Sequence, residues 1–172
     1  MIRRAKDCDI SQIVSIYEEI LSLEEAGKIT TGWIKGIYPV EKNALAALSE
    51  GTLYVLEENG EILASAVINQ KEADGYDKAS WEIEAKREEV LVIHTLTVSP
   101  SASGCGYGTE FIRFYEAMGK KLGVKDLRLD TNERNKAARS LYKKLGYNEV
   151  GIVESDFNGL GKVKLVCLEK KI

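Results

Sequence analysis

Apolar positions recur along this chain with two periods, and each period predicts one kind of secondary structure. After Asp9 the apolar residues up to position 21 are spaced by three and four, which predicts a helix with one buried face. Residues 53–57 and 61–69 flank Asn59-Gly60, a dipeptide that favours the positive φ angles of a tight hairpin turn. The first part of the chain therefore predicts a helix and a pair of antiparallel strands.

The rest of the chain continues this mixture of helices and strands. The run 90–98 is apolar enough for a central strand, and the stretch 107–122 predicts a helix that ends at Gly123. The charged residues 71–89 predict an irregular loop. The remaining predictions are a helix near 40–48, a short strand at 127–130, a helix at 135–145 that ends before Gly146, and two strands at 147–154 and 162–169 around Phe157-Asn158-Gly159. The pattern indicates an α/β (α+β) fold.

A glycine-rich loop joins the strand at 90–98 to the helix at 107–122. It reads Val98-Ser-Pro-Ser-Ala-Ser-Gly-Cys-Gly-Tyr-Gly108. Glycines leave backbone N–H groups free to point outward, and the start of a helix adds unpaired donors and a partial positive charge. The loop is therefore a candidate cradle for an anion, and pyrophosphate is the anion that it suits best.

Two common phosphate-binding motifs do not fit this loop. A dinucleotide fingerprint requires a third glycine where Thr109 stands. A Walker A loop requires Lys and then Ser or Thr after its last glycine, whereas Gly108 is followed by Thr109, Glu110 and Phe111. A nucleotide-binding protein is therefore the weakest of the functions considered.

Two segments of the chain carry a family resemblance. The loop Ser103-Gly104-Cys105-Gly106-Tyr107-Gly108 resembles a pantetheine and pyrophosphate loop of the form Gln/Arg-x-x-Gly-x-Gly/Ala, and the segment from Asn135 through Tyr142 to Gly146-Tyr147 resembles a helix that an Asn opens. Both are signatures of the GNAT superfamily of N-acetyltransferases. The resemblance extends over about residues 1–169, with its sharp motifs in 90–147. Ser103 departs from the pattern, which implies weaker affinity for coenzyme A and not the loss of the site.

The resemblance implies a fold and an activity. The fold is the GNAT acyl-CoA N-acyltransferase fold, a mixed twisted sheet with helices on both faces, in which residues 2–4 form a first strand and residues 1–172 a single domain. The activity is that of an acetyl-CoA-dependent N-acetyltransferase, which transfers the acetyl group directly to a primary amine of a small molecule or a protein. A non-catalytic acyl-CoA binding or sensor module on the same fold is the alternative. Asn135 and Tyr142 together favour the enzyme, because a sensor needs the glycine loop but no acid.

The resemblance also implies the residues that bind the coenzyme. The end of the strand at 90–98 would bind the pantetheine arm through its backbone, and the loop and helix start would bind the pyrophosphate. The implied coenzyme-binding residues are Leu96, Thr97, Val98, Ser103, Gly104, Cys105, Gly106, Tyr107, Gly108, Thr109, Asn135 and Tyr142. Tyr142 matches the catalytic tyrosine that protonates the departing thiolate, although an aromatic ring packed on Leu145 is the alternative for this residue.

An amine acceptor must lose a proton before it can attack. With a pKa of ~10.4, an alkyl ammonium is neutral only about once in 10³ at pH 7. The only histidine, His94, lies on the strand beside the expected thioester and is the candidate catalytic base, with a core histidine as the alternative. Glu82 and Glu84 are weaker candidates. Cys105 lies near a helix start and could be a nucleophile. The resemblance implies direct transfer to the amine, which needs no nucleophile from the enzyme, so Cys105 is interpreted as the variable position of the motif.

Composition and net charge limit the classes of partner that this chain can be expected to bind. The chain has 172 residues, 44% hydrophobic and 30% charged, and no apolar stretch near the ~20 residues of a membrane helix. The N-terminus lacks a signal-peptide pattern, so a cytoplasmic location is expected. A net charge of −3 without a basic patch argues against nucleic acid.

The cysteines and loops complete these expectations. Three widely spaced cysteines with one histidine predict neither a disulfide framework nor a metal site. The expected partners are acetyl-CoA and an unidentified amine, which the loops at 24–39 and 70–89 are expected to select. The oligomeric state is open between a monomer and a homodimer.

Overall fold

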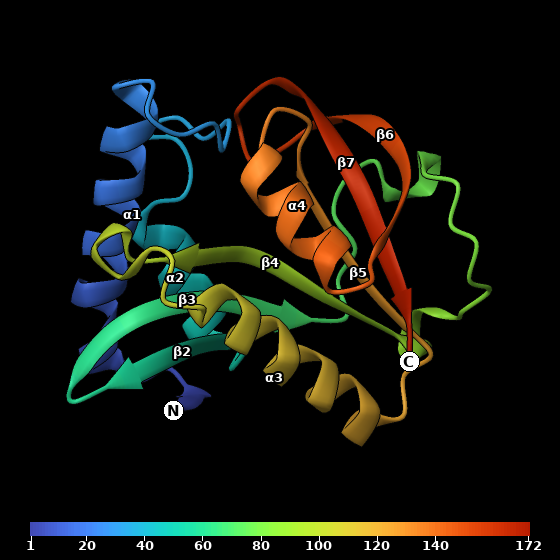
Figure 1. Ribbon diagram of the computed structural model, residues 1–172, viewed down its shortest axis with the longest axis horizontal. Coiled ribbons are helices and arrows are strands. Elements are labelled where there is room, and N and C mark those ends of the chain that lie inside the picture. The colour runs from blue at the N-terminus through green and yellow to red at the C-terminus, as the bar shows by residue number, and fades with distance from the viewer.

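The computed structural model of the chain describes residues 1–172 and contains helices and strands in the predicted order (Figure 1). No helix combines the length and the apolar character that crossing a membrane requires. The strands are β1 Ile2–Arg4, β2 Leu53–Glu58, β3 Glu61–Asn69, β4 Val90–Val98, β5 Asp126–Asn132, β6 Asn148–Asp156 and β7 Lys162–Lys171. The longer helices are α1 Ile10–Glu25, α2 Glu41–Ser49, α3 Tyr107–Leu122 and α4 Lys136–Lys144.

The strands form one seven-stranded sheet of order β1-β2-β3-β4-β5-β7-β6, which confirms the predicted mixed sheet. Every neighbouring pair is antiparallel except β4 and β5, which are parallel. The predicted β2–β3 hairpin has φ angles of 53° at Asn59 and 84° at Gly60. β5 is longer than the predicted strand at 127–130, because it pairs with β7 over its whole length.

The sheet buries apolar side chains on both faces. On β2, Leu53 and Val55 belong to a cluster with α1 and α2, whereas Tyr54 and Leu56 belong to the larger cluster that contains α3 and Tyr142 of α4. This alternation follows from the two-residue period of a strand. The helices therefore cover both faces of the sheet, as the resemblance implied.

The segment between β3 and β4 is irregular, as predicted, with short 3₁₀ turns at Tyr76–Lys78 and Arg87–Glu89. Tyr76 is buried in a third cluster with residues of β4, β6 and β7. This segment therefore covers part of the sheet that the four longer helices leave open.

β4 and β5 separate in the middle of the sheet. They pair only from Val90 to Val92 on β4 and from Asp126 to Arg128 on β5. Beyond these residues β4 pairs only with β3, and β5 pairs only with β7. The register between β3 and β4 shifts at Ser65/Val67, and Thr95 in this stretch has a φ angle of 51°. A bulge of this kind bends a strand away from its neighbour.

Tyr115 of α3 holds the two strands together where they still pair. Its buried hydroxyl lies 2.6 Å from the carbonyl oxygen of Leu91 on β4 and 3.0 Å from that of Arg128 on β5. The hydroxyl has a single hydrogen, which these two carbonyl oxygens share in a buried position. The base of the separation between the strands therefore depends on one side chain from the helix that covers it.

Replacing the Tyr115 hydroxyl tests whether it holds β4 and β5 together. We expect Tyr115→Phe to lower the free energy of unfolding by about 1–3 kcal/mol, because two buried carbonyl groups lose a donor. Urea unfolding measures this loss. Tyr54→Phe is the matched control in the same core, since the Tyr54 hydroxyl makes only a 3.4 Å contact with Arg4. Equal losses of unfolding free energy in the two variants would contradict this role of the Tyr115 hydroxyl.

Candidate active site

The glycine loop before α3 has the conformation that its sequence predicts. Gly104 and Gly106 have φ angles of 82° and 89°, and a Cβ at either position would meet no atom within 4 Å. The backbone N–H groups of Gly104, Gly106, Tyr107, Gly108 and Thr109 donate to no group of the chain. These donors gather at the N-terminus of a 16-residue helix, where the helix dipole also favours an anion.

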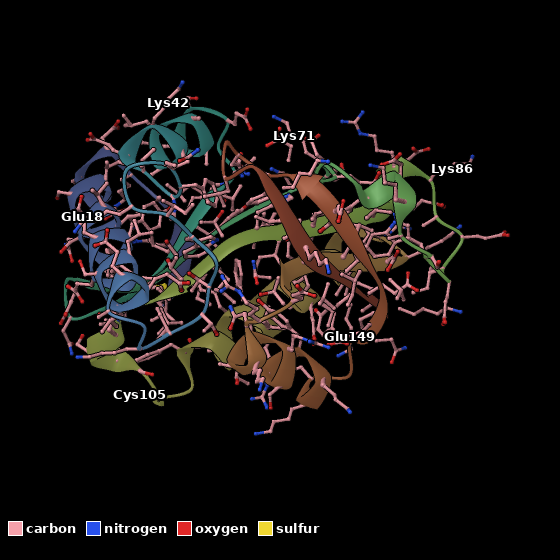
Figure 2. The ribbon with its side chains drawn as sticks, turned by 90° about the horizontal axis from the view of Figure 1, so that it is seen from above. Glu18, Lys42, Lys71, Lys86, Cys105 and Glu149 are labelled. Carbon is pink, nitrogen blue, oxygen red and sulfur yellow. The ribbon has the colours of Figure 1, made fainter.

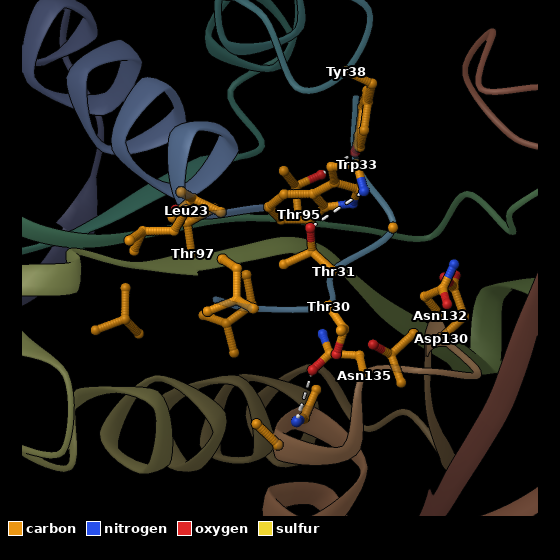
Figure 3. Close-up of a pocket in the computed structure, with 18 of the residues that line it drawn as sticks. Leu23, Thr30, Thr31, Trp33, Tyr38, Thr95, Thr97, Asp130, Asn132 and Asn135 are labelled. Carbon is orange, nitrogen blue, oxygen red and sulfur yellow. Dashed lines mark hydrogen bonds between the residues drawn. The ribbon is translucent and has the colours of Figure 1, made fainter. Parts of the chain in front are cut away.

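A cavity of about 490 Å³ lies where β4 and β5 separate. Figure 3 shows residues of β4, of the 28–38 segment and of the β5–α4 connection around it. Seven of the predicted site residues line it: His94, Leu96, Thr97, Val98, Ser103, Asn135 and Tyr142. The glycine loop continues directly from Ser103, so the anion cradle adjoins this cavity.

Asn135 and Tyr142 share the helix that closes one side of the cavity. The Asn135 side-chain oxygen accepts a hydrogen bond of 3.2 Å from the backbone N–H of Ala138, which confirms the predicted N-cap. Tyr142 lies two turns further along, lines the cavity and has no hydrogen-bond partner for its hydroxyl within the chain. Burial raises the pKa of this hydroxyl above its ordinary value, so Tyr142 carries its proton at neutral pH.

His94 lines the cavity but is already hydrogen-bonded. Its Nε2 lies 2.9 Å from the backbone carbonyl of Lys71 and 3.2 Å from the Asn69 side-chain oxygen. A carbonyl only accepts, so Nε2 carries the proton and Nδ1 holds the free lone pair. Burial lowers the pKa of His94 to about 4, against the opposing effect of the Lys71 carbonyl. The imidazole is therefore neutral and weakly basic.

Asp130 is a cavity residue that sequence reasoning missed. It lies on β5 just beyond the part of that strand that pairs with β4, half-buried, with its Oδ2 2.9 Å from the Tyr76 hydroxyl. Burial raises the pKa of Asp130 to about 6, and the hydrogen bond from Tyr76 opposes this shift. No local signal marks it in the sequence, since the separation of β4 and β5 is what brings this strand residue to a cavity.

The segment 28–33 crosses the cavity and is fixed at both sides. The Glu24 carboxylate accepts hydrogen bonds from the Thr31 hydroxyl at 2.8 Å and the Gly32 backbone at 3.2 Å. The Thr30 hydroxyl donates to the backbone carbonyl of Arg134 at 2.9 Å. Gly32 packs so closely on the end of β5 that a Cβ would lie 2.2 Å from the Asn132 side chain. Residues 28–33 therefore cover one side of the cavity.

The two loops expected to select the acceptor contribute unequally. Residues 28–33 and Tyr38 line the cavity, whereas no residue of 70–89 does. The β6–β7 hairpin takes part instead through Phe157, Leu160, Val163 and Leu165. The helix near 40–48, observed as α2, lines only a smaller, neighbouring pocket of about 320 Å³.

Three residues weighed for chemistry lie outside the cavity. Cys105 is exposed, and Figure 2 shows it at the edge of the molecule. Glu82 and Glu84 are exposed on the segment before β4. The cavity therefore brings together His94, Tyr142 and Asp130. Cys105, Glu82 and Glu84 lie outside it.

A sequence model of the acetyltransferase (GNAT) family matches residues 15–147, which include the glycine loop, β4, β5 and α4. The chain belongs to the acetyltransferase (GNAT) family. Proteins of this family use acetyl-CoA, and the described chain contains no group of three or more His, Cys, Asp or Glu side chains placed to hold a metal ion.

Known proteins agree with this GNAT assignment. An uncharacterised N-acetyltransferase from Methanocaldococcus jannaschii is 33% identical over 75 residues, which cover 44% of this chain and 33% of that relative. The chain thus matches only about a third of that relative's length. A GNAT-family acetyltransferase structure from Streptococcus agalactiae has a TM-score of 0.79 and 25% identity over 100% of this chain and 95% of that one.

A third comparison concerns the cofactor. A candidate acetyltransferase from Salmonella typhimurium, whose structure contains its cofactor acetyl-CoA, has a TM-score of 0.69 and 18% identity. The match covers 99% of this chain and 92% of that one. At this identity it shows the GNAT fold alone.

The burial of Asp130 predicts a pH-dependent effect on stability. Its folded pKa of about 6 exceeds its ordinary 3.8, so the stability that its proton binding contributes is present below pH ~4 and is lost as the pH rises through 6. Asp130→Asn keeps an acceptor for Tyr76 and cannot ionise. We therefore expect the variant to gain stability relative to the parent between pH 4 and pH 8, by urea unfolding.

The control for this prediction is Asp74→Asn, at an exposed carboxylate. Its stability relative to the parent should not change with pH. A constant difference between Asp130→Asn and the parent across the same range would contradict the raised pKa of Asp130.

Proposed function

We propose that this chain is an acetyl-CoA-dependent N-acetyltransferase that transfers the acetyl group directly to a primary amine. The observation that carries the proposal is the continuity of two features. The unpaired edge of β4 leads into the glycine loop with its free N–H donors. Groups able to give and take a proton lie in the cavity between β4 and β5.

The residues present fit acetyl-CoA. A pantetheine arm carries amide groups in an extended chain, and strand edges without a partner bind such a chain as an added strand. Leu96 to Val98 have such an edge, because β4 pairs with β3 alone there. The pyrophosphate would then meet the N–H groups of residues 104 and 106–109. Since the protein has a net charge of −3, these local donors and not long-range attraction must hold the phosphates.

Tyr142 is suited to act as the general acid. Acetyl-CoA supplies a thioester, and its sulfur needs a proton as it leaves. The Tyr142 hydroxyl keeps its proton at neutral pH and has no competing acceptor in the chain. Asn135 holds the start of the same helix in place, which fixes the direction in which Tyr142 points.

Asp130 is better suited than His94 to take the proton from the amine. The carboxyl group of Asp130 has a pKa of about 6, whereas that of the neutral His94 ring is about 4. A base works best when its pKa lies near the working pH. Asp130 also carries a negative charge above pH 6, which attracts the ammonium form of the acceptor. His94 would serve instead to hold the bulged part of β4 against residues 69–71.

The glycine loop gives the first test. We expect acetyl-CoA at 100 times its Kd to stabilise the parent by ~2.7 kcal/mol, seen as a rise in Tm. Gly106→Val should abolish this rise, because its side chain would occupy the open space where the phosphates would lie. Gly123→Val is the matched control: Gly123 lies at the other end of α3, also with a positive φ angle and open space. Equal shifts in the two variants would show that the loop does not bind the coenzyme.

Tyr142 gives the second test. Tyr142→Phe removes one hydroxyl and keeps the ring, so we expect kcat to fall by about 10²-fold or more while the Kd for acetyl-CoA changes little. Tyr147→Phe is the control, since Tyr147 packs beside Tyr142 with ring centroids 6.1 Å apart but does not line the cavity. Unchanged turnover in Tyr142→Phe would remove the acid from the mechanism. Tight acetyl-CoA binding without turnover of any amine by the parent would favour the sensor module.

A further inference from the structure

The acceptor end of the cavity is walled by three aromatic rings. Trp33 and Tyr38 come from the segment before α2, and Phe157 comes from the β6–β7 hairpin, so only the folded chain brings them together. The Tyr38 ring lies edge-on to both neighbours, with centroids 6.0 Å from Trp33 and 5.2 Å from Phe157. Figure 3 shows Trp33 and Tyr38 on one side of the cavity. This wall offers apolar ring faces and edges, with the Tyr38 ring at 84° to Trp33 and 83° to Phe157.

The charged groups in the cavity are few. Asp130 is the only carboxylate among the lining residues, and Lys28, which is exposed at the rim, is the only ammonium. His94, a further lining side chain that can ionise, is neutral at pH 7. One acceptor ammonium can therefore be paired inside the cavity. A second ammonium would be buried without a partner, which is strongly unfavourable.

The cavity also limits size. Its volume of about 490 Å³ must hold both the acetylated end of the coenzyme and the acceptor. The segment 28–33 is tied to Arg134 by Thr30 and packed on Asn132 by Gly32, which fixes its position beside the cavity. Tyr38, hydrogen-bonded to Thr95, lines both this cavity and the smaller neighbouring pocket of about 320 Å³.

From these three features we infer that the acceptor is a small primary monoamine with an aromatic body, such as a 2-arylethylamine. This inference rests on the proposed N-acetyltransferase function. The ring packs against Trp33 and Phe157, and the ammonium pairs with Asp130. The ammonium gives one proton to Asp130, and the neutral nitrogen forms a bond to the acetyl carbon. The bond from that carbon to sulfur breaks as Tyr142 gives its proton to the sulfur, which leaves as the free thiol. The second proton, which the nitrogen loses as the amide forms, returns to the Tyr142 oxygen.

The test compares four amines by the rate at which the parent forms acetylated product, measured by mass spectrometry. 2-Phenylethylamine has both required features, ethanolamine lacks the ring, cadaverine adds a second ammonium, and an alanine-initiated hexapeptide represents a protein N-terminus. We expect kcat/KM for 2-phenylethylamine to exceed each of the others by at least tenfold. A higher value for cadaverine or the hexapeptide would overturn the inference and leave the proposed function standing.

Variants at the aromatic wall connect this preference to the structure. Phe157→Ala should lower the ratio of kcat/KM for 2-phenylethylamine to kcat/KM for ethanolamine by tenfold or more, and Phe157→Leu should restore part of the loss. Ile152→Ala is the control on the same hairpin, at a side chain that is 56% exposed. Equal loss with both amines would assign Phe157 a structural role and overturn the inference.

Binding separates failure of this inference from failure of the proposed function. If no amine is acetylated although acetyl-CoA binds, the proposed function is wrong. In that case 2-phenylethylamine should still raise the Tm of the coenzyme A complex, and Phe157→Ala should remove the rise. Absence of the rise in the parent would overturn the inference as well.

Discussion

The separation of β4 from β5 is the constraint on which the rest of this structure depends. Two parallel strands that pair for only three residues leave strand edges unsatisfied, which is costly unless water, a side chain or a ligand satisfies them. Here Tyr115 joins the strands within their paired stretch, and the bulge at Thr95 turns β4 away. The cavity, the exposed edge of β4 and the position of Asp130 all follow from this geometry.

Burial sets the proton chemistry of the site. The same loss of water that raises the pKa of Asp130 to about 6 lowers that of His94 to about 4, because burial disfavours the charged form of either group. At neutral pH the cavity thus holds one anionic carboxylate, one neutral imidazole and two protonated phenols, those of Tyr38 and Tyr142. The Tyr76 hydroxyl moderates the shift of Asp130, so the segment before β4 affects the cavity without lining it.

Features of this site that depend on neighbouring residues in the sequence could be predicted. Features that depend on residues far apart in the sequence could not. The glycine loop, the Asn135 cap and the Asn59-Gly60 turn depend on neighbours within a few positions, and the structure confirms each conformation. Asp130 and Phe157 come to the cavity because β5, β7 and β6 lie side by side, an arrangement that no short pattern encodes. His94 was chosen for its residue type, whereas its basicity depends on burial and on the Lys71 carbonyl.

The central claim is that the open edge of β4 and the glycine loop together bind the acetyl donor. Hydrogen–deuterium exchange with and without acetyl-CoA measures this directly, amide by amide. The account predicts slower exchange confined to residues 96–98 and 104–109 with the adjoining start of α4, and no change at Gly123. Binding that instead protects residues 69–74 beside the smaller pocket, or that leaves 96–109 unchanged, would contradict it.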